Sequence, residues 1–253
     1  MGALHAGHLS LIEKSRQENA YTACSIFVNP IQFNNREDLN NYPRRQEEDL
    51  AKLREAGCDF VILPTPEQMY PAPPRLRFDF GKLETEMEGK FRPGHFSGVA
   101  TVVAKLFHVV HPDRAYFGQK DWQQYVIIRQ MSRDLSFPLE VISCPTVRES
   151  DGLAMSSRNL RLSAEQRAQA PLIYQTLQQA KQALQDGQSP EEVQQTAWET
   201  LAVIESFEPE YLTIREAHSL LPLAKSPAGT RVVIATAVYL QPVRLIDNVL
   251  LEL

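Results

Sequence analysis

The chain has 253 residues, a formal net charge of −5 and a hydrophobic content of 43%, values typical of a folded protein with a sizeable core. Scattered Lys and Arg exclude the basic face of a general nucleic-acid binder, so we expect any nucleotide to be a small-molecule substrate. The cysteines form no C-x-x-C pair, no apolar run approaches a membrane span and no signal peptide opens the chain, which together predict a soluble, cytoplasmic protein.

The first eight residues contain two histidines, His5 and His8, and run directly into an amphipathic pattern from Leu9 to Lys14. The histidines would therefore flank the first turn of a helix, where unpaired backbone N–H groups and the helix dipole attract a phosphate. Gly7 would let a nucleotide approach the backbone closely. An H-x-x-H pattern alone is weak, and zinc is the obvious rival. The spacing and the missing adjacent carboxylate favour phosphate over metal.

Short β-rich runs then alternate with amphipathic helical patterns as far as Cys144. The predicted strands are Thr22–Val28, Asp59–Leu63, Arg114–Phe117 and Leu139–Ser143, and the predicted helices are Arg45–Ala56, Val99–Val110 and Asp121–Arg133. This alternation predicts a parallel sheet covered by helices, with ligands bound at the carboxyl ends of the strands.

Polar residues follow two of these strands. Gln32 lies in the loop after the first, and Lys120 follows the third, with Gln124 at the start of the next helix. Lys120 can meet a phosphate as a point charge, and the glutamines can read hydroxyl and carboxylate groups. A solvated turn lysine and surface amides are the alternatives. The turn Arg92–Phe96 fits either an anion site or simple packing.

The composition changes after Arg158. Ser163 and Gln166 form a capping box that predicts a helix to about Gln185, and Ser189–Pro190 opens another that runs to about Glu205. Tyr211–Arg215, Arg231–Leu240 and Val243–Ile246 are predicted strands. We expect a small α+β domain whose helices precede a short antiparallel sheet. Just before it, the polar segment Ala154–Asn159 offers two hydroxyls and a guanidinium, which suit closure over a triphosphate or an ordinary loop.

Taken together, these motifs resemble the pantothenate synthetase (pantoate–β-alanine ligase) family of the nucleotidyltransferase superfamily. The matching segments, in family order, are Met1–His8, Phe27–Phe33, Arg92–Val99, Phe117–Gln124 and Asp151–Asn159. The resemblance implies a Rossmann-like ATP- and pantoate-binding domain over residues 1–146 and a smaller α+β lid domain over residues 147–253. It also implies a homodimer, with no nucleic-acid or membrane partner.

The implied reaction activates pantoate with ATP, as MgATP, to a pantoyl adenylate, which β-alanine then attacks with release of AMP. The residues that the resemblance assigns to ATP are Met1, Gly2, Ala3, Leu4, His5, Ala6, Gly7, His8, Gly118, Gln119, Lys120, Asp121, Val147, Met155, Ser156, Ser157 and Arg158. Among them His8, as proton donor, His5, Lys120, Ser156, Ser157 and Arg158 would be catalytic. Gln32 and Gln124 would bind pantoate and β-alanine, and no side-chain metal site is expected. The charged segment Asn34–Arg45 would exclude water from the adenylate.

Two departures from the family pattern are visible. Gln119 stands where the family usually has Glu, which removes a carboxylate but keeps Lys120 and Asp121. Family members also place a strand and a helix before the histidine motif, so we expect an N-terminally incomplete first domain whose first strand is missing. Two alternatives stay open: a nucleotidyltransferase acting on another small acid, and a catalytically inactive, truncated nucleotide-binding remnant.

Overall fold

The structure of the chain is a computed structural model that describes residues 2–34, 39–40, 42–223 and 229–253. The chain divides into two compact units. Unit 1 comprises residues 1–119 and 123–147, and unit 2 comprises residues 120–122 and 148–253. In the described ranges, no helix is both long and apolar enough to cross a membrane.

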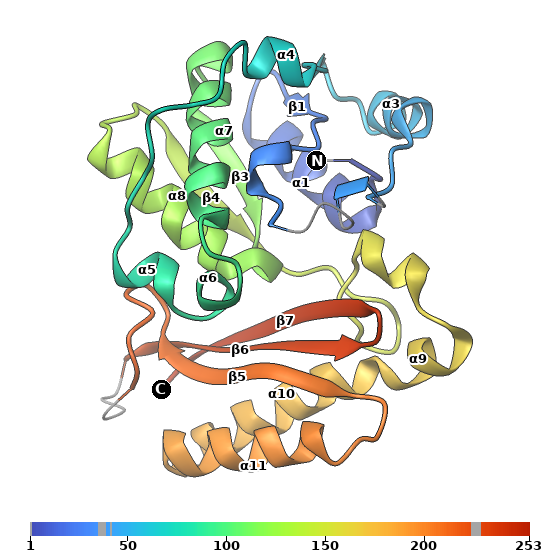
Figure 1. The fold of residues 1–253 in the computed structure, drawn as a ribbon, viewed down its shortest axis with the longest axis vertical. Helices are drawn as coiled ribbons and strands as arrows, with labels where there is room; N and C mark the ends of the chain where they lie inside the picture. Colours follow the sequence, from blue (N-terminus) through green and yellow to red (C-terminus); the bar gives the residue numbers. More distant parts are fainter. Residues whose placement is uncertain (1, 35–38, 41, 224–228) are drawn as a thin grey trace. The chain divides into compact units, whose positions relative to one another are not determined.

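Unit 1 contains a first parallel strand pair, β1 (Ala23–Ser25) and β2 (Phe60–Ile62). It packs against α1 (Ala6–Glu18) and α3 (Gln46–Glu55), as Figure 1 shows. The shared core consists of Leu4, Ile12, Cys24 and Leu53, all nearly inaccessible to solvent. Because Leu4 belongs to this core, the segment that leads into α1 is fixed by apolar burial as well as by its backbone.

A second parallel pair, β3 (Arg114–Gly118) with β4 (Glu140–Cys144), completes the strands described in unit 1. Two helices, α7 (His95–Val110) and α8 (Trp122–Asp134), cover it (Figure 1). The core between them is apolar and contains Val99, Ala100, Phe107, Ile128 and Met131. The α/β class, with parallel strands covered by helices, is therefore confirmed.

Several short helices that the sequence pattern did not predict join these elements: η1 (Pro30–Gln32), α4 (Pro66–Met69), α5 (Lys82–Thr85), α6 (Glu88–Phe91) and η2 (Gln119–Asp121). The side chain of Gln123, 3% exposed, fixes the α5–α6 segment. Its Oε1 accepts from the N–H of Glu88 at 3.0 Å, and its Nε2 donates to the carbonyls of Leu83 and Glu86 at 2.7 and 2.9 Å. Side-chain hydrogen bonds from α8 thus replace the regular pairing that these short turns lack.

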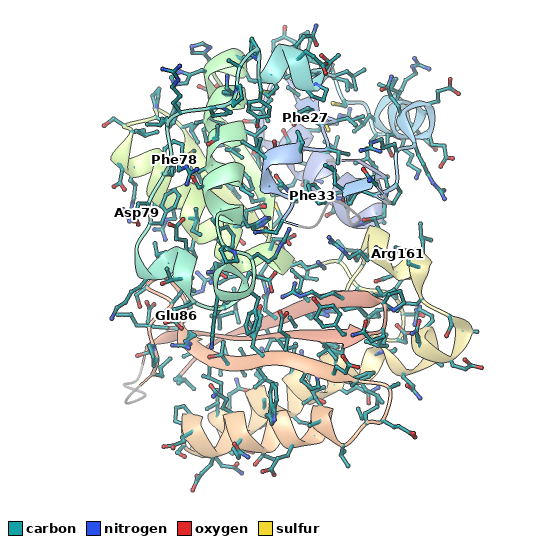
Figure 2. All side chains as sticks on the ribbon, viewed as in Figure 1. Phe27, Phe33, Phe78, Asp79, Glu86 and Arg161 are labelled. Carbon is teal, nitrogen blue, oxygen red and sulfur yellow. The ribbon has the colours of Figure 1, made fainter. Side chains whose placement is uncertain are left out.

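Unit 2 packs helices on one antiparallel sheet. Its strands lie in the order β5 (Glu208–Glu216), β6 (Arg231–Leu240) and β7 (Val243–Glu252). The helices are α9 (Ala164–Gln169), α10 (Pro171–Gln185) and α11 (Pro190–Ala202), and the short η3 (Ser157–Arg161) precedes them. Figure 2 labels Arg161 at the end of η3. The expected small α+β fold, helices first and antiparallel strands afterwards, is confirmed.

The predicted continuous helix from Ser163 to Gln185 is wrong at one point. Ser163 does cap a helix, accepting from the N–H of Gln166, but α9 ends at Gln169 and α10 begins at Pro171. Proline lacks an N–H for the preceding turn and its ring crowds the carbonyl four residues back, so it starts a helix more readily than it continues one. The capping box therefore marks the first helix start correctly, and Pro171 marks a second.

Leu177 tests the packing of α10 against the sheet. Its side chain is fully buried in the core of unit 2, so Leu177→Ala should lower the free energy of unfolding by about 2–5 kcal/mol through lost transfer energy and an unfilled cavity. Urea unfolding measures the change. Val203→Ala, at a position 81% exposed just after α11, is the control and should cost less than about 0.5 kcal/mol. Equal losses in the two variants would contradict this packing.

Candidate active site

The histidine pair lies at the start of α1, as the sequence predicts. His5 is the N-cap residue, and its carbonyl accepts from the N–H groups of His8 and Leu9 at 2.8 and 3.1 Å. The N–H of His5 donates to Nδ1 of His8 at 3.3 Å, and the two ring centroids are 4.0 Å apart. A neutral imidazole that accepts at Nδ1 carries its proton on Nε2. The backbone of His5 therefore makes Nε2 of His8 a hydrogen-bond donor.

The segment before this helix is fixed by α3. The buried carboxylate of Asp49 accepts from the N–H of Ala3 at 2.8 Å and from the N–H of Leu4 at 2.6 Å. Nζ of Lys52, one turn later, donates to the carbonyl of Leu4 at 2.7 Å. Ala3 has a positive φ of 50°, a conformation that a non-glycine residue keeps only when its surroundings impose it. Asp49 and Lys52 therefore determine where the histidine pair begins.

Gln32 is the last residue of η1, beside the start of α7. We expect its side chain to bind hydroxyl and carboxylate groups. The backbone carbonyl of Gln32 accepts from Nδ1 of the buried His95 at 2.8 Å. A Cβ on Gly98 would lie 2.6 Å from the carbonyl oxygen of Ile31, so only glycine lets α7 approach this backbone so closely. His95 thus has a structural role in this packed turn.

The side-chain amide of Gln32 has a defined orientation. Nδ2 of the buried Asn29 donates to the carbonyl of Gly98 at 3.2 Å and to Oε1 of Gln32 at 3.0 Å. The hydroxyl of Tyr70 donates to Oδ1 of Asn29 at 2.8 Å, and burial raises the pKa of Tyr70 to about 12, so this donor stays protonated. Because a carbonyl oxygen only accepts, this series of hydrogen bonds places Oε1 of Gln32 toward Asn29 and directs Nε2, a donor, away from it.

Sequence reasoning named Gln32 but not Asn29, Tyr70 or Asp49. Asn29 lies inside the recognised segment Phe27–Phe33, so the Asn–Pro dipeptide was the available signal. Tyr70 lies 41 positions from Asn29, and nothing in the local pattern connects the two. Aromatic rings line the same part of unit 1: Phe27, labelled in Figure 2, lies 6.2 Å from the ring of Tyr70.

Unit 2 contains the cationic and hydroxyl candidates. Lys120 and Asp121 belong to η2, directly after Gly118 ends β3 and before α8. Ser156 is the N-cap of η3, and its Oγ accepts from the N–H of Arg158 at 3.2 Å, whereas Ser157 is buried. Nδ2 of Asn159 donates to the carbonyl of Ala154 at 3.0 Å, which closes the segment into a compact turn. The Ser156 hydroxyl therefore also has a local structural role.

The remaining candidates divide between the same two units. Unit 1 contains the histidine pair with its neighbours Gly2 to Gly7, and also Gln32, Gly118, Gln119, Gln124 and Val147. Unit 2 contains Lys120, Asp121 and residues 155–158. Met1 lies outside the described residues, as do residues 35–38 and 41 of the proposed water-excluding segment. Among the described residues, no group of three His, Cys, Asp or Glu side chains could hold a metal ion.

Burial favours the protonated thiol at all three cysteines. Burial raises the pKa of the Cys24 thiol to about 12, and it also raises the pKa values of Cys58 and Cys144. A thiol is a good nucleophile or metal ligand only as the thiolate. The chemistry proposed for the site therefore does not rely on a thiolate.

A substitution of Asp49 tests the two hydrogen bonds that fix the segment before the histidine pair. Asp49→Asn keeps the shape but leaves one backbone N–H facing an amino group, so the free energy of unfolding should fall by about 1–3 kcal/mol. Glu47→Gln, which removes the same charge from an exposed position in the first turn of α3, should change it by less than about 0.5 kcal/mol. Urea unfolding compares the two variants, and an equal loss would show that helix charge, not the two hydrogen bonds, matters.

Known proteins resemble this chain over nearly its whole length. The family model described as pantoate-beta-alanine ligase matches residues 1–250. The pantothenate synthetase of Cytophaga hutchinsonii is 47% identical over 100% of this chain and 90% of its own length. That of Thermus thermophilus is 48% identical over 98% of this chain and 90% of its own.

Solved structures give the same result. Pantothenate synthetase from Thermus thermophilus superposes with a TM-score of 0.92 at 47% identity, over 98% of this chain and 90% of that one. Pantoate-beta-alanine ligase from Francisella tularensis, solved with beta-gamma ATP and beta-alanine, has a TM-score of 0.79 at 35% identity, over 99% of this chain and 87% of that one. Because sequence and fold agree over nearly its whole length, this chain belongs to the pantoate–β-alanine ligase family.

Proposed function

We propose that this chain is a pantothenate synthetase, which condenses pantoate with β-alanine at the expense of ATP and releases AMP and pyrophosphate. Family membership over residues 1–250 supports the reaction class. The observation that carries the chemistry is the histidine pair at the N-terminus of α1, where the N–H of His5 occupies Nδ1 of His8 and leaves Nε2 as the donor. Such a site suits a phosphate on which charge develops.

In the first step, a carboxylate oxygen of pantoate attacks the α-phosphorus of ATP. The bond from that phosphorus to the bridging oxygen breaks, and its electron pair leaves on pyrophosphate. We assign His8 and His5 to hydrogen bonding at the phosphates, and Lys120, Ser156, Ser157 and Arg158 to the charge that grows on pyrophosphate. By likeness to the family, the proposed ATP site is completed by Met1, Gly2 to Gly7, Gly118, Gln119, Asp121, Val147 and Met155.

In the second step, the amine of β-alanine attacks the acyl carbon of pantoyl adenylate. The amide bond forms, the bond to AMP breaks and the amine loses a proton to solvent. We assign Gln32 and Gln124 to pantoate, with Gln32 also at β-alanine. The orientation of Gln32 supports this role, because a neutral N–H donor binds the pantoate carboxylate without cancelling the charge that makes it a nucleophile.

Magnesium enters this proposal as part of the substrate MgATP. Mg²⁺ usually keeps several waters and is bound through substrate phosphates with at most one or two carboxylates. Bound to ATP, the ion would neutralise phosphate charge, and the chain's own residues need only orient the complex.

The organisation of the enzyme is also proposed. We assign ATP and pantoate binding to a Rossmann-like domain over residues 1–146 and a lid function to residues 147–253. By likeness to the family we propose a cytoplasmic homodimer. Parallel strand pairs with helices on them in unit 1, and a helix-covered antiparallel sheet in unit 2, support this division.

Substitutions of His8 can separate the proposed role of Nε2 as a hydrogen-bond donor from a purely structural role of the imidazole ring. Asn at this position keeps an acceptor near the place of Nδ1 but removes the distal donor, whereas Gln keeps an N–H near the place of Nε2. His8→Asn should therefore lower kcat for adenylation by about 10²–10³-fold, as loss of one oriented donor does, and His8→Gln should retain more activity. Pantoate-dependent exchange of pyrophosphate into ATP measures this step.

The unaltered enzyme provides the control for the reaction itself. It should form AMP only when pantoate, β-alanine and MgATP are all present. Pyrophosphate release without free AMP would instead indicate a nucleotidyltransferase, and ATP binding by calorimetry without turnover would indicate an inactive nucleotide-binding protein. Equal activity of the Asn and Gln variants would contradict the role given to Nε2 of His8.

A substitution of Gln32 tests its proposed role in binding pantoate. Gln32→Glu still accepts from Asn29 but presents an anionic oxygen to the pantoate carboxylate. The loss of a hydrogen bond to a charged group, worth about 1.5–3 kcal/mol, should raise KM for pantoate on the order of 10–100-fold. Gln175→Glu, the same exchange at an exposed position on α10, is the control and should leave KM unchanged. An unchanged KM in Gln32→Glu would remove this residue from the pantoate site.

A further inference from the structure

Unit 2 contains a buried ion pair that the proposed reaction does not use. The carboxylate of Asp247, on β7 and 5% exposed, accepts from both terminal nitrogens of Arg148, at 2.6 Å for Oδ2 and 2.9 Å for Oδ1. The backbone N–H of Asn248 adds a bond to Oδ1 at 2.8 Å. Burial raises the pKa of Asp247, and Arg148 opposes that rise. The paired fork fixes both side chains in orientation as well as in distance.

Arg148 uses its other donors on nearby backbone. One terminal nitrogen donates to the carbonyl of Gly152 at 3.1 Å and the other to the carbonyl of Asn248 at 3.2 Å, while the guanidinium lies 3.6 Å from the ring centre of Tyr174. Gly152 has a φ of +93°, and a Cβ there would lie 2.6 Å from that ring. The turn from Arg148 to Ala154 is thereby closed on a rigid support, directly before the segment 155–158.

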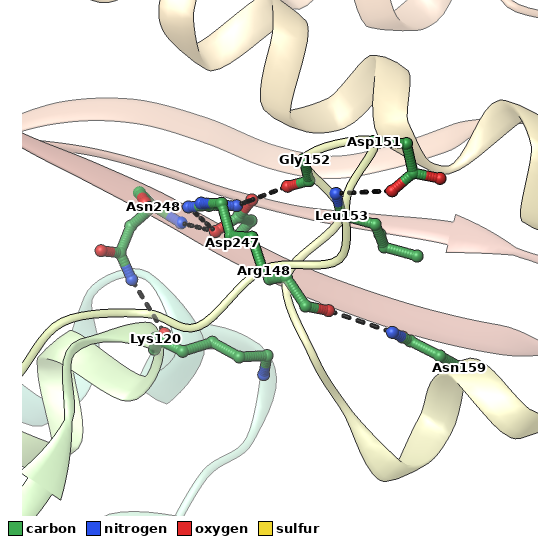
Figure 3. A network of polar contacts seen from close by, with 9 residues as sticks. Lys120, Arg148, Asp151, Gly152, Leu153, Asn159, Asp247 and Asn248 are labelled. Carbon is green, nitrogen blue, oxygen red and sulfur yellow. Dashed lines mark hydrogen bonds and ion pairs between the residues drawn. The ribbon is translucent and has the colours of Figure 1, made fainter. Parts of the chain in front are cut away.

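Asn248, the residue after Asp247, binds the backbone of Lys120, the lysine proposed to contact phosphate. Nδ2 of Asn248 donates to the backbone carbonyl of Lys120 at 2.8 Å. Figure 3 shows Lys120, Asn248, Asp247, Arg148 and Gly152 as one continuous network. Two consecutive residues of β7 therefore fix two parts of unit 2 that are far apart in sequence, the Lys120 turn and the turn that leads into residues 155–158.

We propose that Asn248 is a positioning residue for adenylation, which sets the place of Lys120 relative to Ser156 and Arg158 on the support formed by the Arg148–Asp247 pair. The proposal rests on the function proposed above. Lysine is a point charge on a flexible stem, so the phosphate that it reaches depends on where its backbone is fixed. A displacement of about 1 Å in such a group costs on the order of a hundredfold in rate.

Asn248→Asp is the sharpest test, because it keeps the shape and places a carboxylate oxygen against the carbonyl of Lys120. In pantoate-dependent pyrophosphate exchange we expect kcat/KM for ATP to fall about tenfold or more, since the Lys120 turn moves. Aminolysis of supplied pantoyl adenylate by β-alanine should change less than about twofold, because that step has no pyrophosphate for Lys120 to meet. A purely structural role would not separate the two half-reactions.

Val249→Ala is the matched control. It removes buried methyl groups from the next position of β7 and lowers stability, but it leaves the amide of Asn248 in place. Its kcat/KM for ATP should match that of the unaltered enzyme at a temperature where thermal unfolding shows all proteins folded. An equal fall in both half-reactions of Asn248→Asp, or the same loss in Val249→Ala, would overturn the proposal.

A double-mutant cycle identifies the partner. If Asn248 acts through Lys120, then Asn248→Ala should add no loss, within about twofold, to that of Lys120→Ala, whereas fully additive losses would overturn the proposal. Asn248→Ser replaces the Asp variant if the latter does not fold, and it should show the same separation of half-reactions. Absence of adenylation by the unaltered enzyme would refute the proposed function, while an active enzyme with unaffected Asn248 variants would refute this inference alone.

Discussion

The carboxylate of Asp49 accepts the two backbone N–H groups of Ala3 and Leu4, and the geometry of the histidine site depends on that contact. These N–H groups precede α1, so the helix itself offers them no partner, and burial without one would cost free energy. Asp49 satisfies both from α3 and fixes the direction in which the chain enters α1. The N-cap position of His5, and the hydrogen bond from its N–H to Nδ1 of His8, follow from that direction.

Buried polar side chains also fix two other candidate residues on irregular backbone. Asn29 orients the amide of Gln32, and Asn248 binds the carbonyl of Lys120. In each case a side-chain amide donates to an oxygen of the candidate residue. Buried amides are rigid in this use, because reversing one would place two donors or two acceptors against each other. The proposed substrate contacts thus rest on a second set of polar residues to which no substrate contact is assigned.

Local pattern predicts the regular elements well. The predicted strand Arg231–Leu240 has its observed bounds, and the predicted helix over residues 45–56 differs from the observed one by one residue at each end. Hydrophobic periodicity and capping residues are local signals, so they can be recognised without knowledge of the fold. The break at Pro171 is local too, because proline alone starts the new helix. The α5–α6 turns cannot be predicted in this way, because Gln123 of α8 forms their hydrogen bonds.

The sequence by itself determined the α/β class, the order of most of the longer helices and strands, the position of the histidine pair at a helix start, and the family, since motifs and their order are properties of the chain alone. The tertiary structure decided which nitrogen of His8 donates, which way the amide of Gln32 faces and what fixes Lys120 in unit 2. These depend on contacts from Asp49, Tyr70 and Asn248, whose partners lie 41 to 128 positions away in sequence. A hydrogen bond has strict distance and direction, and only folding brings such distant donors and acceptors within reach.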